Sequence, residues 1–118
     1  MKTFNLEERL IKFSVKIIQL VDGVKKSRAG NHLSGQLIRS GTSCALNYGE
    51  AQGSESTKDF IHKLKIILKE LRESHICLRI IEEARLHSDN SELINVKKEN
   101  NELIAIFVAS ISTSQKKG

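Results

Sequence analysis

The absence of proline is the feature of this sequence that most limits its fold. None of its 118 residues is proline, and proline breaks or kinks helices because it lacks a backbone N–H and clashes with the preceding turn. A chain of this length without proline can therefore form long, uninterrupted helices. Apolar residues that recur at intervals of three and four, which is the period of a helix, then indicate where those helices lie.

Four segments of the chain show this period. The first follows Asn5, which together with Glu8 has the form of a capping box. The second is expected to begin after Asn31 as its N-cap, and the third after Ser56. The expected helices cover residues 5–26, 32–52, 57–86 and 92–113.

Short polar connections between these segments predict an all-α fold, an up-down-up-down four-helix bundle. We expect one domain over residues 1–118, with a frayed tail at residues 114–118. The composition is 39% hydrophobic and 28% charged, which is typical of a globular protein and not of a disordered or membrane-embedded one. Length and composition therefore both suit one compact domain.

The N-terminal segment does not have the pattern of a signal peptide. Its apolar run from Leu10 to Val21 is interrupted by lysines, and no small-residue cleavage site follows it. No stretch is long and uncharged enough to cross a membrane. The two cysteines, Cys44 and Cys77, are expected to be reduced thiols. We therefore expect a cytoplasmic protein without membrane contact.

The second helix is unusually rich in small residues. Residues 40–56 read SGTSCALNYGEAQGSES. The phosphate-binding glycine motifs have other spacings, so residues 40–52 are expected to be helical. Each glycine inside a helix costs about 1 kcal/mol relative to alanine. The presence of Gly41 and Gly49 therefore predicts that neighbouring helices pack closely on more than one side of this helix.

The third helix carries a second apolar side in addition to its core stripe. The residues of this side are Ile66, Ile76, Cys77, Ile80 and Ala84. A contiguous apolar patch left on a surface usually marks an interaction site, and the pattern favours self-association, with these residues at the oligomer interface. The alternative is that the fourth helix wraps around the third and covers them.

Two rows of basic residues follow the helical period. They are Arg9, Lys12 and Lys16 on the first helix, and Lys58, Lys65, Lys69 and Arg72 on the third. Most such rows only keep a helix soluble. The functional alternative is contact with the phosphates of RNA or another nucleic acid, which the net charge of +5 permits. With four Phe and one Tyr, the chain offers no aromatic stacking platform, so such binding is expected to tolerate any base sequence.

No group of residues in the sequence has the spacing of a catalytic or metal site. Asp59 and His62 stand three residues apart, as in one arm of a di-iron bundle. A carboxylate at a helix start is better explained as a partner of the helix dipole. Cys44 lies on a core stripe, where a thiol acts as a small apolar residue. We therefore expect no enzyme, no metal or other cofactor, and no small-molecule substrate.

Several runs along the second and third helices resemble one bacterial protein family. They are SGTS at residues 40–43, EAQ at residues 50–52, DFIHKL at residues 59–64 and KELRES at residues 69–74. The members of this family are four-helix bundles, and the founding members are encoded in intervening sequences of 23S ribosomal RNA genes. The resemblance is most specific over residues 33–86, and the helix order fits the whole chain.

The resemblance implies an up-and-down four-helix bundle that assembles as a homopentamer. A related branch, the accessory proteins of diversity-generating retroelements, forms basic pentamers that bind nucleic acid and a reverse transcriptase. Members often have Tyr-Trp where this chain has Ile76-Cys77, and Pro or Gly in place of Ala45. The patch on the third helix stays apolar despite this change, so association is still expected.

The resemblance also implies a polar network between the second and third helices. By matching position, the family's polar signature falls on Arg39, Ser43, Asn47, Glu50, Glu70 and Glu73. We expect its members on the second helix to hydrogen-bond to groups on the third helix such as Glu70 and Glu73. These bonds would fix the register of the helices inside the bundle or across a subunit contact.

The sequence therefore leads to one functional hypothesis and one alternative. The hypothesis is a non-catalytic homo-oligomer, expected to be a pentamer, that associates with RNA or another nucleic acid through its basic rows. The alternative is a scaffold or adaptor for other proteins, in which the basic rows serve only solubility.

Overall fold

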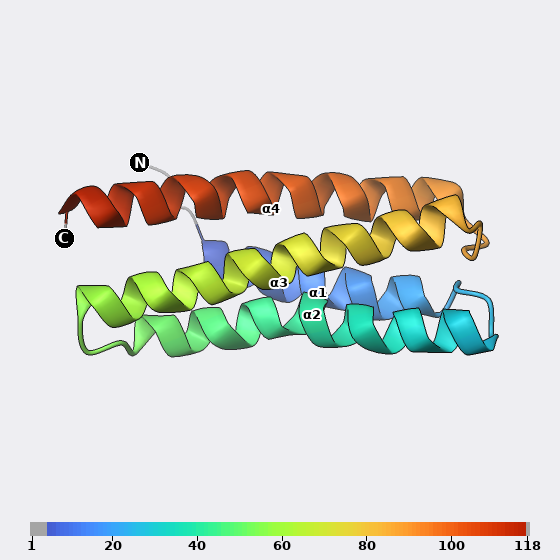
Figure 1. Cartoon of the computed structure of the whole chain (residues 1–118), viewed down its shortest axis with the longest axis horizontal. Helices are drawn as coiled ribbons and strands as arrows, with labels where there is room; N and C mark the ends of the chain where they lie inside the picture. The colour runs from blue at the N-terminus through green and yellow to red at the C-terminus, as the bar shows by residue number, and fades with distance from the viewer. Residues whose placement is uncertain (1–4, 118) are drawn as a thin grey trace.

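The computed structural model describes residues 5–117 of the chain, and these form four helices joined by short connections. Each helix runs antiparallel to the one before it (Figure 1). Neighbouring helices pack in the order α1, α2, α3 and α4, and α4 also touches α1. The predicted all-α four-helix bundle is therefore confirmed. The helices are α1 (Leu6–Val21), α2 (Arg28–Gln52), α3 (Thr57–Glu83) and α4 (Asn90–Lys117).

The packing order places α1 and α3 at opposite corners of the bundle. Figure 1 shows α3 in front of α1, with α4 along one side of this pair and α2 along the other. Within the described residues, α1 and α3 make no close backbone approach. The outer sides of these two helices therefore face in different directions.

The predicted starts of the first and third helices are confirmed by their caps. The Asn5 Oδ1 atom accepts a hydrogen bond from the Glu8 N–H at 3.0 Å. The Ser56 hydroxyl accepts one from the Asp59 N–H at 3.1 Å. Each cap satisfies an N–H group that has no partner inside its own helix, so the polar residues at these two positions set where α1 and α3 begin.

The second helix starts earlier than predicted. It begins at Arg28 and not after Asn31, and its N-cap is Ser27, whose hydroxyl accepts from the Gly30 N–H at 3.0 Å. Glycine usually marks a break in a helix. In the structure this glycine permits the tight helix start, because a Cβ atom there would lie 1.9 Å from the Lys25 carbonyl oxygen.

The ends of the helices also differ from the prediction. α1 and α3 stop a few residues short of their predicted ends. α4 runs on to Lys117, so the predicted frayed tail is wrong for residues 114–117, while residue 118 lies outside the described residues. The buried Ile111 anchors this end of α4 to the bundle, and two lysines in the last turn complement the helix dipole.

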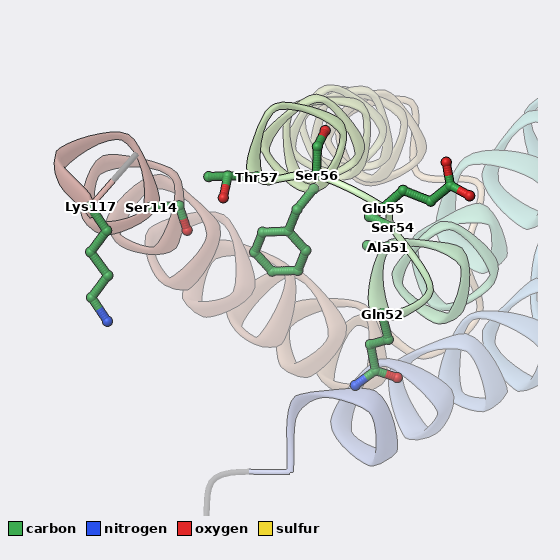
Figure 2. A pocket seen from close by; sticks show the side chains of 9 residues that line it. Ala51, Gln52, Ser54, Glu55, Ser56, Thr57, Ser114 and Lys117 are labelled. Carbon is green, nitrogen blue, oxygen red and sulfur yellow. The ribbon is translucent and has the colours of Figure 1, made fainter.

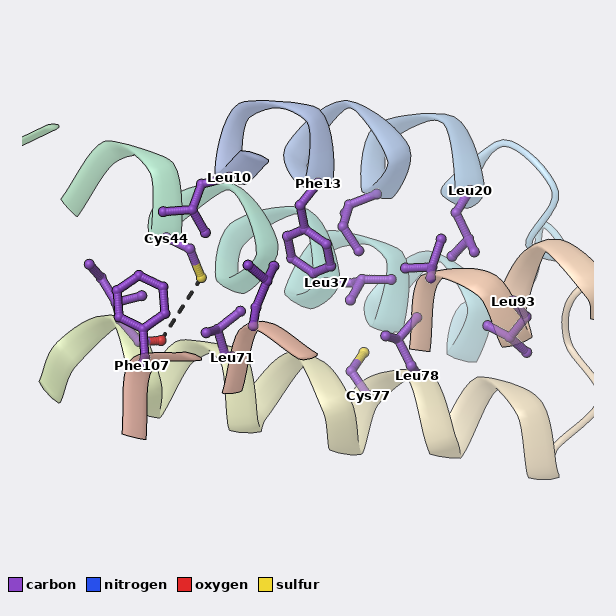
Figure 3. Packing of buried hydrophobic residues seen from close by; sticks show 14 of the residues in the cluster. Leu10, Phe13, Leu20, Leu37, Cys44, Leu71, Cys77, Leu78, Leu93 and Phe107 are labelled. Atoms are coloured by element: carbon purple, nitrogen blue, oxygen red, sulfur yellow. Dashed lines mark hydrogen bonds between the residues drawn. The ribbon is translucent and has the colours of Figure 1, made fainter. Parts of the chain in front are cut away.

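The core consists of apolar side chains from all four helices. Figure 3 shows part of it, in which Phe13 of α1, Leu37 of α2, Leu71 of α3 and Phe107 of α4 are buried together. The ring of Tyr48 packs edge-on against Phe107, with the two ring centroids 6.0 Å apart. Burying a large apolar side chain stabilises a fold by about 1.5–3 kcal/mol, so this core is the main source of stability.

The connections at one end of the bundle are hydrogen-bonded to each other. The Lys25 N–H of the α1–α2 connection donates to the Leu86 carbonyl of the α3–α4 connection at 2.7 Å. The Asp89 N–H donates to Nδ1 of the buried His87 ring at 2.9 Å, so Nε2 of this ring carries the proton. Nε2 then donates to the Leu20 carbonyl at 2.8 Å. These bonds fix how α1 and α3 are placed relative to each other.

Candidate interaction surfaces

The outward side of α3 has two halves of different chemistry. The N-terminal half is basic, whereas the C-terminal half is apolar, with Ile76 52% exposed and Ile80 46% exposed. Both halves point away from the core, so one side of one helix presents positive charge and then apolar surface along its length. The basic row of α3 consists of the exposed residues Lys58, Lys65, Lys69 and Arg72.

The basic row of α3 is free to meet an anion. Within residues 5–117, none of its four cations forms an ion pair. A hollow of about 410 Å³ lies beside Lys58 and Lys65, and it is closed on the α4 side by Gln115. Cations without a carboxylate partner can form charge-assisted hydrogen bonds to phosphate oxygens without first breaking an ion pair.

The basic row predicted on the first helix does not join that of α3. Arg9 Nε lies 2.8 Å from Glu99 Oε2, and Arg9 Nη2 lies 2.8 Å from Glu102 Oε1, both on α4. The hydrogen bond to Glu99 is the largest cause of the raised pKa of Arg9. Arg9 therefore ties α1 to α4, a structural role that the sequence analysis missed. Lys12 and Lys16 are exposed, but α1 and α3 stand at opposite corners.

The apolar patch on α3 is smaller than predicted. Cys77 is buried, and its thiol donates to the Leu33 carbonyl of α2 at 3.4 Å. Burial raises the pKa of this thiol to about 11. Placing Cys77 at an interface was wrong, because α2 packs closely enough to widen the buried side of α3. Ile66 is half-buried. The exposed residues that remain, here called the α3 patch, are Ile76, Ile80 and Ala84.

The fourth helix does not cover the α3 patch. α4 meets α3 on another side, where Lys97 pairs with Glu82. The α3 patch instead lines a shallow hollow of about 340 Å³, together with Arg79 and Glu83. The alternative that α4 wraps around α3 is therefore wrong, and the single chain leaves an apolar surface exposed.

Ion pairs connect α2 and α3 at part of the predicted polar network. Arg39 Nη1 lies 3.0 Å from Glu70 Oε2, and the same guanidinium pairs with Glu73. Glu50 pairs with a different residue of α3, Lys63, with 2.5 Å between Oε1 and Nζ. These contacts join the exposed edges of the two helices.

Ser43 and Asn47 do not reach α3 of the same chain, so the bonds predicted for them inside the bundle are wrong, while bonds across a subunit contact stay a prediction. The Ser43 hydroxyl donates to the Ser40 carbonyl at 3.1 Å, and the Asn47 amide donates to the Ser43 carbonyl at 2.9 Å. Short polar side chains can bond in this way to their own helix one turn back. The sequence analysis instead missed a buried link, in which the hydroxyl oxygens of Ser40 and Ser74 lie 2.8 Å apart. Its sequence signal is a serine on the core side of each helix.

An exposed apolar row on α1 was also missed. Ile11, Val15 and Ile18 are 42%, 46% and 49% exposed, whereas Leu10 and Ile17 beside them are buried. The spacing of four and three residues places the three exposed side chains on one side of the helix, away from the core. This α1 apolar row (Ile11, Val15 and Ile18) could have been found from its spacing, since it follows the helical period as closely as the core stripe does.

The described residues hold no metal-binding cluster, and a polar hollow lies at one end of the bundle. No group of three or more His, Cys, Asp or Glu side chains in residues 5–117 could hold a metal ion. A hollow of about 440 Å³ opens where the α2–α3 connection meets the end of α4 (Figure 2). Its lining combines hydroxyl groups with Glu55, Lys117 and the ring of Phe60. Within residues 5–117, none of these hydroxyl groups is hydrogen-bonded to Glu55 or Lys117.

The comparisons with known proteins agree with the fold. A family model described as 23S rRNA-intervening sequence protein matches residues 2–109. The chain is also similar to a solved structure from Bacteroides thetaiotaomicron VPI-5482, a protein with unknown function from the S23 ribosomal protein family. The two share 26% sequence identity and a TM-score of 0.82, over 91% of this chain and 98% of the other.

Neither of these two matches indicates a catalytic family. No curated protein matches the chain. Within residues 5–117, no helix has both the length and the apolar character needed to cross a bilayer. The function must therefore be argued from the surfaces of the bundle itself.

Proposed function

This chain belongs to the 23S rRNA-intervening sequence protein family, and from that premise we propose that it is a non-catalytic homo-oligomer, expected to be a pentamer, that binds RNA or another nucleic acid. The observation that carries the proposal is the basic row of α3. Its four cations are exposed, and within the described residues none has a carboxylate partner.

The geometry of the row suits a phosphate backbone. Lys65, Lys69 and Arg72 follow one another at intervals of one helical turn, which is a rise of about 5.4 Å. Cations spaced along a rod can each neutralise one phosphate, whereas reading a base sequence needs hydrogen bonds to base edges. The expected binding therefore tolerates any sequence and weakens with salt. Four phosphate contacts predict a slope of roughly −3 in a plot of log affinity against log salt concentration.

Assembly would strengthen this weak contact. Each copy in a homo-oligomer contributes one basic row, and binding through several rows at once raises the effective concentration of the remaining ones. A single row of four cations is too small for tight binding at physiological salt. The proposed oligomer and the proposed nucleic-acid contact therefore support each other.

The alternative function is a scaffold for other proteins. It is favoured by the α3 patch, because exposed apolar surface is typical of protein interfaces, and in this case the basic row only keeps the bundle soluble. Measuring wild-type affinity for a structured RNA at several salt concentrations separates the two. A log–log plot with no slope would remove the phosphate contact and leave the scaffold.

Two matched charge reversals test the proposed site. Lys65→Glu/Lys69→Glu alters two lysines one turn apart on α3, and Lys12→Glu/Lys16→Glu makes the same change on α1. Both variants alter net charge equally, so they separate a local site from a general charge effect. Binding of a fluorescent RNA hairpin, followed by anisotropy, should weaken at least tenfold in the α3 variant only. Equal losses in both variants, or no loss in either, would contradict a site on α3.

A further inference from the structure

The α1 apolar row is bracketed by acidic residues. Glu7 and Glu8 precede Ile11 by about one turn, and Asp22 follows Ile18 by about one turn. All three carboxylates are exposed, and none of them forms an ion pair within the part of the chain that the structure describes. The outer side of α1 is therefore apolar in the middle and negative at both ends.

Lysines do not interrupt this side of α1. Lys12 and Lys16 each follow a member of the α1 apolar row by one residue, which rotates them by about 100° around the helix axis. They lie towards the flank where Arg9 bonds to α4. The apolar row and its acidic ends thus form one continuous strip that is separate from the basic flank.

Arginines stand beside the α3 patch, while Glu73, which precedes Ile76 by three residues, already pairs with Arg39 of α2. Arg72 lies one turn before Ile76, and Arg79 lines the same shallow hollow as the patch. Arg79 Nη2 lies 3.0 Å from Glu83 Oε2, but both side chains are more than half exposed, and exposed pairs of this kind contribute about 0.5 kcal/mol or less. A carboxylate from another molecule can therefore replace Glu83 as its partner.

The two surfaces also agree in length and shape. Ile11 to Ile18 spans about 10 Å along α1, and Ile76 to Ala84 spans about 12 Å along α3, at a rise of about 1.5 Å per residue. The α1 apolar row presents protruding side chains, whereas the α3 patch contains a hollow of about 340 Å³. Ridges on one helix pack into grooves on another, so the exposed side chains of the α1 apolar row can enter this hollow.

We propose that the α1 apolar row of one copy of this chain docks onto the α3 patch of the next copy. The occupant is a second copy because the same chain carries both surfaces, with unpaired carboxylates at the ends of one and Arg72 and Arg79 beside the other, and complementary charge selects a partner. Since α1 and α3 stand at opposite corners, each copy can use both surfaces at once. Such a head-to-tail contact builds a ring when its rotation closes.

This inference rests on the proposed homo-oligomer and specifies how it is joined. It uses the C-terminal half of the outer side of α3, so Lys58 and Lys65 of the N-terminal half stay free in every copy. Arg72 is shared, because it belongs to the basic row and also lies one turn before Ile76. Apart from Arg72, assembly and phosphate contact would occupy different parts of one helix. The two activities can be tested separately, because variants at the α3 patch leave the basic row unchanged.

The first test uses three substitutions of exposed apolar residues by lysine. Val15→Lys alters the α1 apolar row, and Ile76→Lys alters the α3 patch. Val108→Lys on α4 is the matched control, since Val108 is 45% exposed and Val15 is 46% exposed. Light scattering after gel filtration should give monomer mass for the first two variants and wild-type mass for the control. Circular dichroism checks that each variant is folded, and Val15→Ser and Ile76→Ser replace any lysine variant that loses helicity.

The second test mixes the two monomeric variants. The Ile76→Lys chain keeps an intact α1 apolar row, and the Val15→Lys chain keeps an intact α3 patch, so one contact can form between them. The mixture should reach twice the monomer mass and no more. The two surfaces left unused in this pair are the altered α1 apolar row and the altered α3 patch, and neither can bind a third chain. A mixture that stays monomeric, single variants with wild-type mass, or a control that dissociates would each overturn the docking. A monomeric wild type would instead remove the proposed oligomer itself.

Discussion

α2 carries glycines on both its buried side and its exposed side, and their surroundings differ. On the buried side, a Cβ atom at Gly41 would lie 3.0 Å from Ile17 Cγ1, so α1 occupies the space that a side chain would need. On the exposed side, no other described residue comes within 4 Å of such a Cβ at Gly35 or Gly49, apart from the chain neighbours and the nearby backbone of α2 itself. The buried glycine is explained by close helix packing, whereas the exposed ones are not explained by the single chain.

Glycines along one helix therefore do not all permit close packing of another helix. The prediction that helices pack on more than one side of α2 is confirmed, because both α1 and α3 pack against it. Gly41 takes part in this packing, whereas no other helix of the described residues comes within 4 Å of a Cβ at Gly49. A glycine costs about 1 kcal/mol at either place. Only on the buried side does the approach of another helix offset this cost. Replacing glycine by alanine should therefore lower the free energy of unfolding on the buried side and raise it on the exposed side.

The largest effect is expected at the start of α2. Gly30→Ala places a Cβ atom 1.9 Å from the Lys25 carbonyl oxygen, so backbone must move and the Ser27 cap is disturbed. We expect a loss of about 3 kcal/mol in the free energy of unfolding. Gly35→Ala in the same helix is the control and should gain about 1 kcal/mol. Urea unfolding at one fixed protein concentration measures both, and equal effects would contradict the distinction.

The buried hydroxyl pair should give the next largest effect. Ser74 donates to the Glu70 carbonyl at 2.9 Å, so Ser40 is the donor within the pair and Ser74 the acceptor. Ser74→Ala then leaves the Ser40 hydroxyl buried without an acceptor and should cost about 2 kcal/mol, whereas Ser40→Ala should cost about 1 kcal/mol. The double variant should cost less than the sum. Strict additivity in the double-mutant cycle would show that the two hydroxyls do not interact.

A smaller effect, with a change of sign, is expected for the remaining pair of glycines. Gly41→Ala should lower the free energy of unfolding by about 1 kcal/mol, because the Ile17 side chain must shift to admit the new methyl group. Gly49→Ala should raise it by about 1 kcal/mol through better helix propensity. Thermal or urea unfolding measures the free energy of unfolding of both variants. If both are stabilised, the Ile17 side chain of α1 shifts at little cost, which contradicts the prediction for Gly41.

The smallest effect concerns the buried thiol on the same side of α2. Burial raises the pKa of Cys44 from 9.0 to about 12, so at pH 9 and above the unfolded chain loses this proton while the folded chain keeps it. Stability should therefore fall as the pH rises through this range. The loss at pH 9 is about 0.4 kcal/mol. Cys44→Ala should flatten this part of the stability profile, and an unchanged slope would contradict the assignment.

The positions of the helices were largely readable from the sequence. Periodicity found all four, and the caps at Asn5 and Ser56 were correct to the residue. The start of α2 was missed because Asn31 also has the form of an N-cap. Only the path of the chain past the Lys25 carbonyl explains why the helix begins earlier and requires glycine at position 30. The length of α4 was underestimated because residues 112–117 are polar and carry no apolar spacing that would mark a helix.

The surfaces were less predictable than the helices. The basic row of α3 could be read from spacing alone, and the structure leaves all four of its cations exposed. The same reasoning failed for Arg9, which α4 provides with two carboxylates, and for Cys77, which α2 buries. In each failure the deciding group belongs to a helix distant in the sequence.

What the sequence determined by itself is therefore local. The absence of proline, the three-and-four spacing of apolar residues and the polar caps specify helices, because each depends on residues within one or two turns. The tertiary structure decided which sides of each helix are buried by the other helices and which stay exposed. It brought Ser40 to Ser74 and left Val15 and Ile76 exposed on opposite corners of the bundle. The physical reason is that burial depends on the packing of all four helices together, and no single period along the chain contains that information.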